Sequence, residues 1–404
     1  MEGEEMIQLG PLKLMQDEKL CSDFDLTEEK VQTQFGKVTV SVAGDRRRHP
    51  VITMHDLGLN ANSCFQSFFQ FSDMSTVAEH FCVYHVNFPG QESDAAPLSD
   101  TFVYPTMDEL AQILVPVCDH FGIKSFIGFG VGVGANVLVR YAVKHPKQVD
   151  ALILVNCTSR AAGWMEWGYQ KMNARYLRTQ PQVTNFTVDY LMWYHFGRHL
   201  DSCNQDLLDN YRQYFARMTN LKNLAAFVDS WTARTALPLV EHSARRNSVT
   251  AATSGPSGTT PPVEGTATTV DQLKCPVIQL VGWDAAQVND TVELNAKLDP
   301  RNSNWIKVSD ASGLVLEDAP ERVTEAIVLF LQGQGYLPAL SHSKWVQSRH
   351  GSYTAGYDRK SSLQSPVSGG GAKGRSSSSS SARPSLVGSD GGAEHGSPAA
   401  AVNA

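Results

Sequence analysis

The chain has 404 residues, of which 42% are hydrophobic and 19% are charged, and its formal net charge is −7. The charges are unevenly distributed, because residues 341–404 hold seven Lys or Arg against three Asp or Glu, together with 17 serines. That segment carries +4, which leaves −11 for residues 1–340. Such an acidic body excludes the chain-wide basic surface that nucleic acids need, so we expect no DNA or RNA partner.

The seven cysteines indicate a reducing compartment. They are odd in number and widely spaced, and they contain no CxxC pair, so neither a disulfide framework nor a zinc knuckle is expected. The first ten residues are acidic where a signal peptide is basic, and no apolar run is long enough to span a bilayer. We therefore expect a cytoplasmic protein without a transmembrane segment, a metal or a cofactor.

Short apolar strands alternate with amphipathic helices along most of the chain. An acidic arm at residues 1–30 precedes a predicted hairpin, with strands at 31–35 and 37–42 around Gly36. The pattern then predicts strands at 50–54, 81–86, 125–129, 151–156, 277–281 and 305–308, and helices at 63–71, 107–121, 135–145, 288–298 and 321–332. This alternation is typical of a mostly parallel sheet with helices on both faces, and it predicts one α/β domain over residues 31–340.

Three segments depart from this pattern. Residues 160–240 contain four of the seven tryptophans and have helical spacing, which predicts an α-helical cap inserted between two strands. Residues 243–270 are rich in Ser, Thr, Gly and Pro and contain no aromatic residue, so we expect a disordered insertion. The Ser- and Gly-rich residues 341–404 predict a disordered tail.

The glycine-rich run Ser125-Phe-Ile-Gly-Phe-Gly-Val-Gly-Val-Gly134 predicts a strand, a tight turn and a helix start. It matches a dinucleotide-binding fingerprint loosely, but on a late strand, whereas that fingerprint belongs to the first strand–helix turn. The favoured interpretation is the nucleophile elbow G-x-S-x-G, which we align with Gly128-x-Gly130-x-Gly132. Its centre is then Gly130, which has no side chain that could attack a carbonyl.

The other two members of a hydrolase triad follow the nucleophile in the order acid, then histidine. Asp284 comes directly after a buried strand and stands near the acid position. Gly313 stands where the histidine belongs, and no histidine occurs between His242 and His342. Without an imidazole there is no general base for a hydroxyl nucleophile, so the sequence predicts a protein that is not an enzyme.

Four residues are candidates for an oxyanion loop or a remaining pocket. His55 and Asp56 stand where hydrolases carry that loop, Asn60 follows it, and Val131 comes directly after the degenerate elbow centre. The loop could present N–H groups to an anion or an acyl ligand. The favoured interpretation is that His55 and Asn60 hold the loop by hydrogen bonds to the backbone.

Two further patterns carry weaker predictions. His195 and His199 stand four residues apart and could ligate a metal from one helix face, but a packing role is favoured because Gly197 weakens the helix. Ser248 and Ser362 follow pairs of basic residues, so both are candidate sites for a basophilic Ser/Thr kinase.

Several motifs in fixed order resemble the NDRG family (N-myc downstream-regulated proteins). They are His55-Asp-Leu-Gly-Leu-Asn60, His85-Val-Asn-Phe-Pro-Gly-Gln-Glu92, Tyr104-Pro-Thr-Met-Asp-Glu-Leu110 and Lys297-Leu-Asp-Pro300. The resemblance covers about residues 30–340. It implies an α/β-hydrolase fold with a helical cap, no hydrolytic activity, a cytoplasmic location and a phosphorylatable tail.

The resemblance also implies a role in signalling, stress response, growth or differentiation, exerted through other proteins. We expect a monomer that can associate peripherally with membranes. The alternative hypothesis is a small-molecule receptor, or a residual hydrolase, that uses the pocket under the cap.

Overall fold

The computed structural model describes residues 26–239 and 272–338, and these residues form a sheet covered by helices. Eight strands lie side by side in the order β1-β2-β4-β3-β5-β6-β7-β8. The strands are β1 (Thr27–Thr33), β2 (Gly36–Ala43), β3 (His49–Met54), β4 (Phe81–Val86), β5 (Phe126–Val131), β6 (Val149–Val155), β7 (Val277–Gly282) and β8 (Ser303–Val308). From β4 to β8 all neighbours are parallel, whereas β1 and β2 pair antiparallel at one edge.

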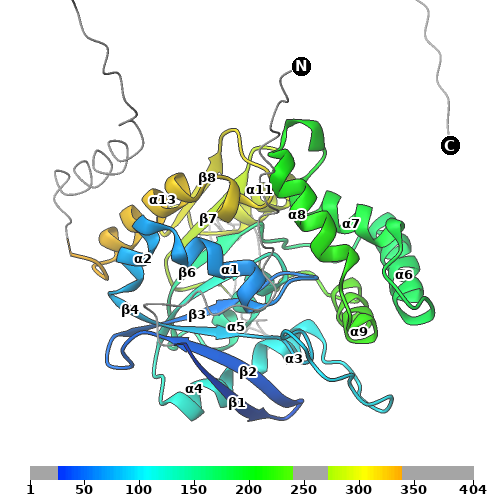
Figure 1. Ribbon diagram of the computed structural model, residues 1–404. Helices are drawn as coiled ribbons and strands as arrows, with labels where there is room; N and C mark the ends of the chain where they lie inside the picture. Colours follow the sequence, from blue (N-terminus) through cyan, green and yellow to red (C-terminus); the bar gives the residue numbers. More distant parts are fainter. Residues whose placement is uncertain (1–25, 240–271, 339–404) are drawn as a thin grey trace, which may run out of the picture. The chain divides into compact units, whose positions relative to one another are not determined.

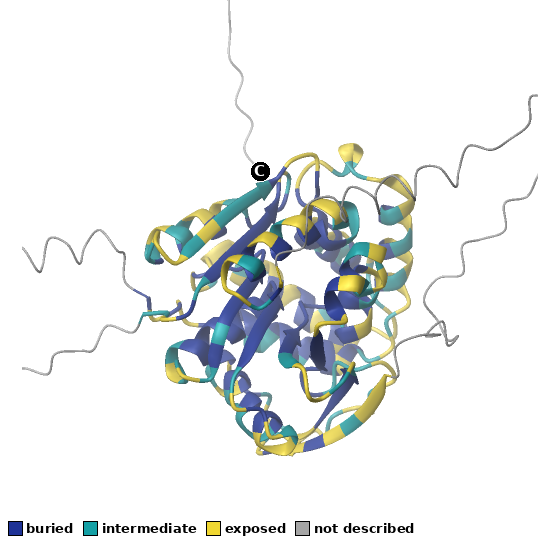
Figure 2. Ribbon diagram, turned by 90° about the vertical axis from the view of Figure 1, so that its left-hand side faces the viewer, coloured by how far each residue is buried: buried dark blue, intermediate teal, exposed yellow. Residues whose placement is uncertain are grey.

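The parallel strands are apolar because helices cover both of their faces. Every residue of β4, β5 and β7 is buried, and Figure 2 shows these strands as a dark blue layer inside exposed helices. Figure 1 shows α1, α2 and α13 in front of the sheet and α5 behind it. Outside the cap the helices are α1 (Ala61–Gln70), α2 (Ser72–Ala78), α3 (Met107–Gln112), α4 (Leu114–Phe121), α5 (Val133–Lys144), α11 (Val288–Lys297), α12 (Val315–Asp318) and α13 (Pro320–Gly333).

The helix expected at 107–121 is broken in two, so that prediction was wrong. Helix α3 ends at Gln112 and α4 begins at Leu114. The physical reason is Pro116, which has no N–H to donate and whose ring is incompatible with the carbonyl four residues earlier in a continuous helix. None of the helices in the described ranges is long and apolar enough to cross a membrane.

Within residues 156–239, which the structure describes, four α-helices follow β6 and form the cap. They are α6 (Trp164–Thr179), α7 (Asn185–Phe196), α8 (Gln205–Ala216) and α9 (Leu221–Thr232), and Figure 1 shows them in green beside the sheet. A buried Trp231 and Phe227 on α9 and Leu177 on α6 anchor them to the main core. The cap is therefore packed as part of the folded domain.

The N-terminal boundary differs from the expected one. Residues 27–30, assigned to an acidic arm, belong to β1 and pair with residues 39–42 of β2. The remaining arm residues up to 25, the insertion at 243–270 with Ser248, and the tail at 341–404 with Ser362 lie outside the described residues.

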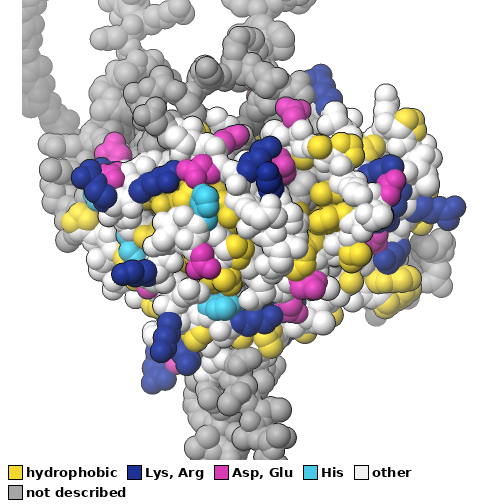
Figure 3. Space-filling view, turned by 90° about the horizontal axis from the view of Figure 1, so that it is seen from below, with side chains coloured by type: hydrophobic (Ala, Val, Ile, Leu, Met, Phe, Trp, Pro, Cys, Tyr) yellow, Lys and Arg dark blue, Asp and Glu magenta, His cyan; other side chains and the backbone are white. Residues whose placement is uncertain are grey.

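On the face shown in Figure 3, basic and acidic side chains are interspersed and hydrophobic side chains lie between them. That face therefore has no broad field of one sign, which is the feature that attracts nucleic acid.

Candidate functional site

The sharp turn between β5 and α5 is centred on Gly132. Its φ is +51° and its ψ is −108°, a conformation that side-chain-bearing residues adopt only under strain. Gly130, which we expected at the centre, lies inside β5 and pairs with Leu154 of β6. The predicted alignment was wrong by two residues, and the elbow is Gly130-x-Gly132-x-Gly134.

The space beside Gly132 is filled by the side chain of Asp56. A Cβ atom built on Gly132 would lie 2.1–2.2 Å from the carboxylate atoms of Asp56. Asp56 itself is 1% exposed and is the second residue after β3. A carboxylate thus stands where a nucleophilic side chain would begin.

The same carboxylate is held by three hydrogen-bond donors. Its Oδ1 accepts from the backbone N–H groups of Leu57 at 2.7 Å and Val133 at 2.9 Å, and from the Tyr194 hydroxyl at 3.0 Å. In hydrolases of this architecture, the N–H after the nucleophile and an N–H from the loop after the third strand form the oxyanion hole. Asp56 therefore occupies the position of the oxyanion with a negative charge of the chain itself.

This geometry also corrects the expectation for Val131. The N–H that points to the oxyanion position belongs to Val133, because the turn lies two residues later than predicted. Val131 is a buried residue of β5 that pairs with Val155.

His55 and Asn60 both hold the loop, which is the interpretation that the sequence favoured. The His55 Nδ1–H donates to the Asp56 carbonyl at 2.9 Å, and its Nε2 accepts from the Phe88 N–H at 3.1 Å. Complete burial lowers the pKa of His55 to about 4, so the ring is neutral. The Asn60 side chain caps α1 by accepting from the Ser63 N–H at 2.9 Å.

The end of helix α7 lies against this loop. Tyr194 donates to Asp56 from α7, and the neighbouring His195 Nε2–H donates to the Leu57 carbonyl at 2.8 Å. Burial lowers the pKa of His195, although Asp56 at 3.9 Å opposes that shift. The role of Tyr194 could not be predicted from the sequence, because nothing near it in the chain indicates a contact with a loop 138 residues away.

The two positions that the sequence predicts for the acid and the histidine of a triad also contact α7 or the segment after it. Gly313 donates its N–H to the Phe196 carbonyl at 3.1 Å, and a Cβ on Gly313 would lie 2.1 Å from the His195 carbonyl oxygen. The Asp284 carboxylate accepts from His199 Nδ1 at 3.0 Å and from the Ser202 hydroxyl at 3.3 Å. A histidine at position 313 would therefore collide with the cap as it is packed here.

His195 and His199 do not face one ligand. Gly197, with a φ of +105°, ends α7, so His199 lies beyond the helix and is exposed while His195 is buried. Among the described residues, no group of three or more His, Cys, Asp or Glu side chains is arranged to hold a metal ion.

A pocket of about 610 Å³ lies beside the closed elbow. Its walls come from α6, α7, α9 and the turn before α11, and Tyr194 stands between this pocket and Asp56. The aromatic side chains in the wall are Tyr169, Phe186, Tyr190, Trp193, Tyr194 and Trp231. This volume is within the range of pockets that hold small organic molecules.

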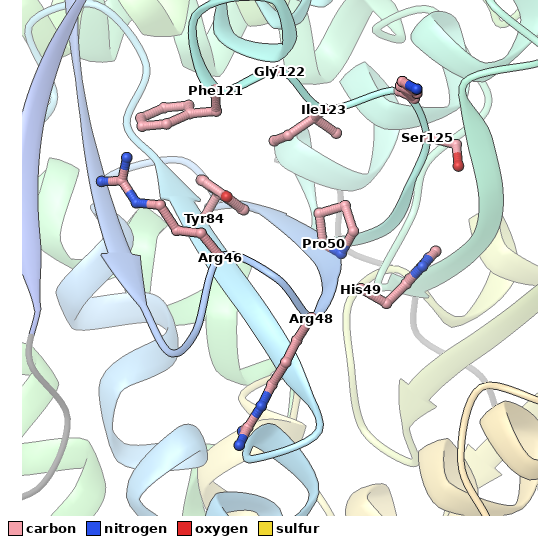
Figure 4. Close-up of a pocket in the computed structure, with 10 residues that line it drawn as sticks. Arg46, Arg48, His49, Pro50, Tyr84, Phe121, Gly122, Ile123 and Ser125 are labelled. Atoms are coloured by element: carbon pink, nitrogen blue, oxygen red, sulfur yellow. The ribbon is translucent and has the colours of Figure 1, made fainter.

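A second, smaller hollow of about 260 Å³ lies at the opposite end of β3 and β5. Basic residues surround it, but Figure 4 shows the side chains of Arg46 and Arg48 pointing away from each other. Arg46 lies over the Phe121 ring at 5.4 Å and pairs with Glu29. These cations do not converge on one anion.

Comparisons with known proteins agree with this architecture. A thermophilic esterase from Thermogutta terrifontis is similar with a TM-score of 0.56 and 18% identity, over 76% of this chain and 99% of that chain. MGS-M2, an alpha/beta hydrolase enzyme from a deep-sea metagenome library, gives 0.57 and 12%, over 78% and 99%. At these identities the likeness shows the fold alone, and it confirms the predicted α/β-hydrolase fold.

Closer relatives are found by sequence. Protein NDRG3 of Xenopus tropicalis is 36% identical over 350 residues, which cover 85% of this chain and 83% of the relative. Protein NDRG1 of the same organism is 34% identical over 335 residues, covering 82% and 77%. The model of the Ndr family matches residues 28–338. The fold, the degenerate elbow and these matches agree with the resemblance in the sequence: this chain belongs to the Ndr family.

Proposed function

We propose that this protein is a catalytically inactive member of the α/β-hydrolase fold that acts in cytoplasmic signalling by binding other proteins. The observation that carries the proposal is the Asp56 carboxylate, which accepts hydrogen bonds from Leu57 and Val133 beside Gly132. Growth control, differentiation and stress response are the processes in which we expect it to act.

Electrostatic repulsion at the elbow, as well as the glycine at its centre, disfavours hydrolysis. A tetrahedral intermediate needs both N–H groups for its developing negative charge, and loss of one such donor typically slows catalysis by about 10²–10³. Here both donors already hold a carboxylate, and a second anion at that place would be repelled. The turn also carries glycine in place of the nucleophile.

An exposed face of the cap supports binding to proteins. Helix α6 exposes Trp164 to 83%, Met165 to 60% and Trp167 to 53%. Large aromatic side chains of this kind dominate the binding energy at protein interfaces. Neighbouring exposed apolar residues on one element are also unusual for a surface that contacts only water.

The tail and the insertion are the proposed sites of regulation. Phosphorylation of Ser248 or Ser362 by a basophilic kinase would add about −1.5 to −2 charges to a basic sequence environment. Either change would create or remove a docking contact for a partner. Phosphopeptide mapping from cells tests this part, and the absence of phosphate at both serines would contradict it.

Two experiments test the proposal as a whole. The purified full-length chain should hydrolyse p-nitrophenyl acetate no faster than the buffer blank, and turnover that disappears in an Asp56→Ala variant would contradict it. Affinity purification should lose partners in a Trp164→Ala/Trp167→Ala variant. Leu329→Ala is the matched control, because Leu329 is 62% exposed on α13, away from the cap.

A small-molecule receptor is the second candidate function. One observation favours it, namely that a pocket of about 610 Å³ persists between the cap helices and the turn before α11 although the elbow beside it is closed. A pocket of this size with aromatic walls is suited to a ligand that is bound and not converted.

A further inference from the structure

The charges of the cap pocket are almost completely paired. Arg234 donates from both terminal nitrogens to the Glu166 carboxylate at 2.8 Å, and Arg160 pairs with Asp290. Asp189 pairs at 3.0 Å with Arg212, which lies outside the pocket wall. Each of these carboxylates therefore already has a guanidinium partner.

Arg198 is the exception in this wall. It lines the pocket, and within residues 26–239 and 272–338 no carboxylate pairs with it. The pocket therefore offers one uncompensated positive charge to a molecule that enters it. A planar guanidinium is suited to a carboxylate, which it can bind through two parallel hydrogen bonds.

The backbone that carries Arg198 is fixed in place. A Cβ on the preceding Gly197 would lie 1.7 Å from the Asp284 carbonyl oxygen, so this segment lies directly against the turn after β7. On the other side, His199 is hydrogen-bonded to the Asp284 carboxylate at 3.0 Å. The residues on both sides of Arg198 are thus anchored to one turn, which holds the backbone of Arg198 at the rim of the pocket, and its side chain is exposed there.

The rest of the wall favours an aromatic body for the ligand. Tyr169 and Phe186 are stacked with ring centroids 5.9 Å apart, and Tyr190 and Trp193 lie 5.8 Å apart. Burial raises the pKa of Tyr190, so its hydroxyl stays neutral and adds no negative charge beside Arg198. Flat rings pack against such a wall by stacking or by edge-to-face contact.

Two polar atoms in the wall lack hydrogen-bond partners in the described protein. They are Nε1 of Trp231, a residue only 1% exposed, and Oε1 of Gln287, a residue 5% exposed. Buried polar atoms are normally paired, and an unpaired one is destabilising. Both atoms are buried within the wall, so they add no accessible polar group to the pocket and leave Arg198 as its unpaired charge.

We propose that the cap pocket binds a small aromatic carboxylate, with its carboxylate on Arg198 and its ring packed against the aromatic side chains of α6 and α7. The inference rests on the second candidate function and assigns the class of its ligand. It requires no reaction, because the ligand is held beside the elbow and separated from it by Tyr194.

Isothermal titration calorimetry of the full-length chain with 2-naphthoate and its neutral analogue 2-naphthamide tests the proposal. We expect 2-naphthoate to bind one-to-one, and Arg198→Gln to weaken its binding about tenfold through loss of a charge-assisted contact. The amide should bind equally to both proteins. Arg175→Gln is the matched control, because Arg175 is an exposed arginine of α6 that does not line the pocket.

A blocking variant separates the ligand class from the pocket itself. Ala286→Phe fills the pocket without changing its charge and should abolish binding of both probes, while an unchanged melting temperature shows that the variant is folded. If Arg198→Gln leaves naphthoate affinity unchanged but Ala286→Phe abolishes it, the anionic class is wrong and the receptor function stands. If the wild-type chain binds neither probe, or if Ala286→Phe binds both normally, the ligand class and the receptor function are both overturned.

Discussion

Gly132→Ser tests whether Asp56 closes the elbow. A non-glycine residue in this conformation costs about 1–3 kcal/mol in backbone strain. The new Cβ would also lie 2.1–2.2 Å from the carboxylate atoms of Asp56, so that side chain must move away from its three donors. Overpacking of this kind costs about 1–3 kcal/mol more, and we expect a total loss of about 2–6 kcal/mol in the free energy of unfolding.

Gly122→Ser is the matched control for the backbone component. Gly122 ends α4 with a φ of +68°, and a Cβ built there meets nothing within 4 Å. Its left-handed conformation costs a side-chain-bearing residue about 1–2 kcal/mol. The backbone conformations of the two glycines differ, so a loss at Gly132 that exceeds the loss at Gly122 by more than about 1–2 kcal/mol is assigned to the steric contribution of Asp56.

Urea unfolding of both variants and of Gly132→Ser/Asp56→Ala measures these free energies. The double variant should be less destabilised than the sum of its single variants, because removal of the carboxylate makes room for the serine. None of the three should gain hydrolysis of p-nitrophenyl acetate, since Gly313 stands where hydrolases of this fold carry the histidine that acts as the base. If Gly132→Ser and Gly122→Ser lose equal stability and the double variant is additive, the assignment of Asp56 to this space is refuted.

The remaining predictions concern the charges that hold the site and the cap. Asp56→Asn should lower the free energy of unfolding, measured in urea, by about 1.5–3 kcal/mol, because a charged acceptor of three hydrogen bonds is lost. A loss below about 0.5 kcal/mol would contradict this expectation, since ordinary surface substitutions change stability by that much. Stability should fall as the pH drops from about 6.5 to about 4, because burial lowers the pKa of His55 and His85 to about 4 and the unfolded chain takes up protons first. Urea titrations at several pH values measure this, and a flat profile over that window would exclude neutral buried histidines. Arg234→Ala should lower the free energy of unfolding by about 2–3 kcal/mol, which is less than the loss expected when a fully buried ion pair is broken, because Glu166 is 30% exposed. Arg212→Ala, which breaks an exposed ion pair, should lower it by about 0–1 kcal/mol. Equal effects of the two arginine substitutions in the same assay would contradict the buried role of Arg234.

The sheet could be predicted from the sequence because its strands are short apolar runs bounded by turn residues. The elbow was placed two residues too early for an equally local reason. Glycines alternate at 128, 130, 132 and 134, so two successive alignments of G-x-G-x-G are equivalent in the sequence. The residue that distinguishes them is Asp56, which binds the N–H of Val133, 77 positions later. A contact over that distance leaves no pattern in either segment alone.

The break at Pro116, by contrast, was available from the sequence. A proline in the interior of an expected 15-residue helix is a local signal, and the structure follows it. The closure by α7 was not available, because Tyr194 and His195 stand in a helix with aromatic residues on every side, and nothing there distinguishes a core contact from a contact with the loop.

Because α7 packs against the loop after β3, the hydrogen exchange of two backbone amides should depend on the position of the cap. The N–H groups of Leu57 and Val133 are shielded only while Asp56 stays in place, and Asp56 is held from the other side by Tyr194. Any partner or ligand that lifts α7 should speed their hydrogen exchange, and any that holds α7 down should slow it. Binding at the outer surface of the cap can thus be detected by the hydrogen exchange of amides near the carboxyl end of β3, where hydrolases of this fold form their oxyanion hole.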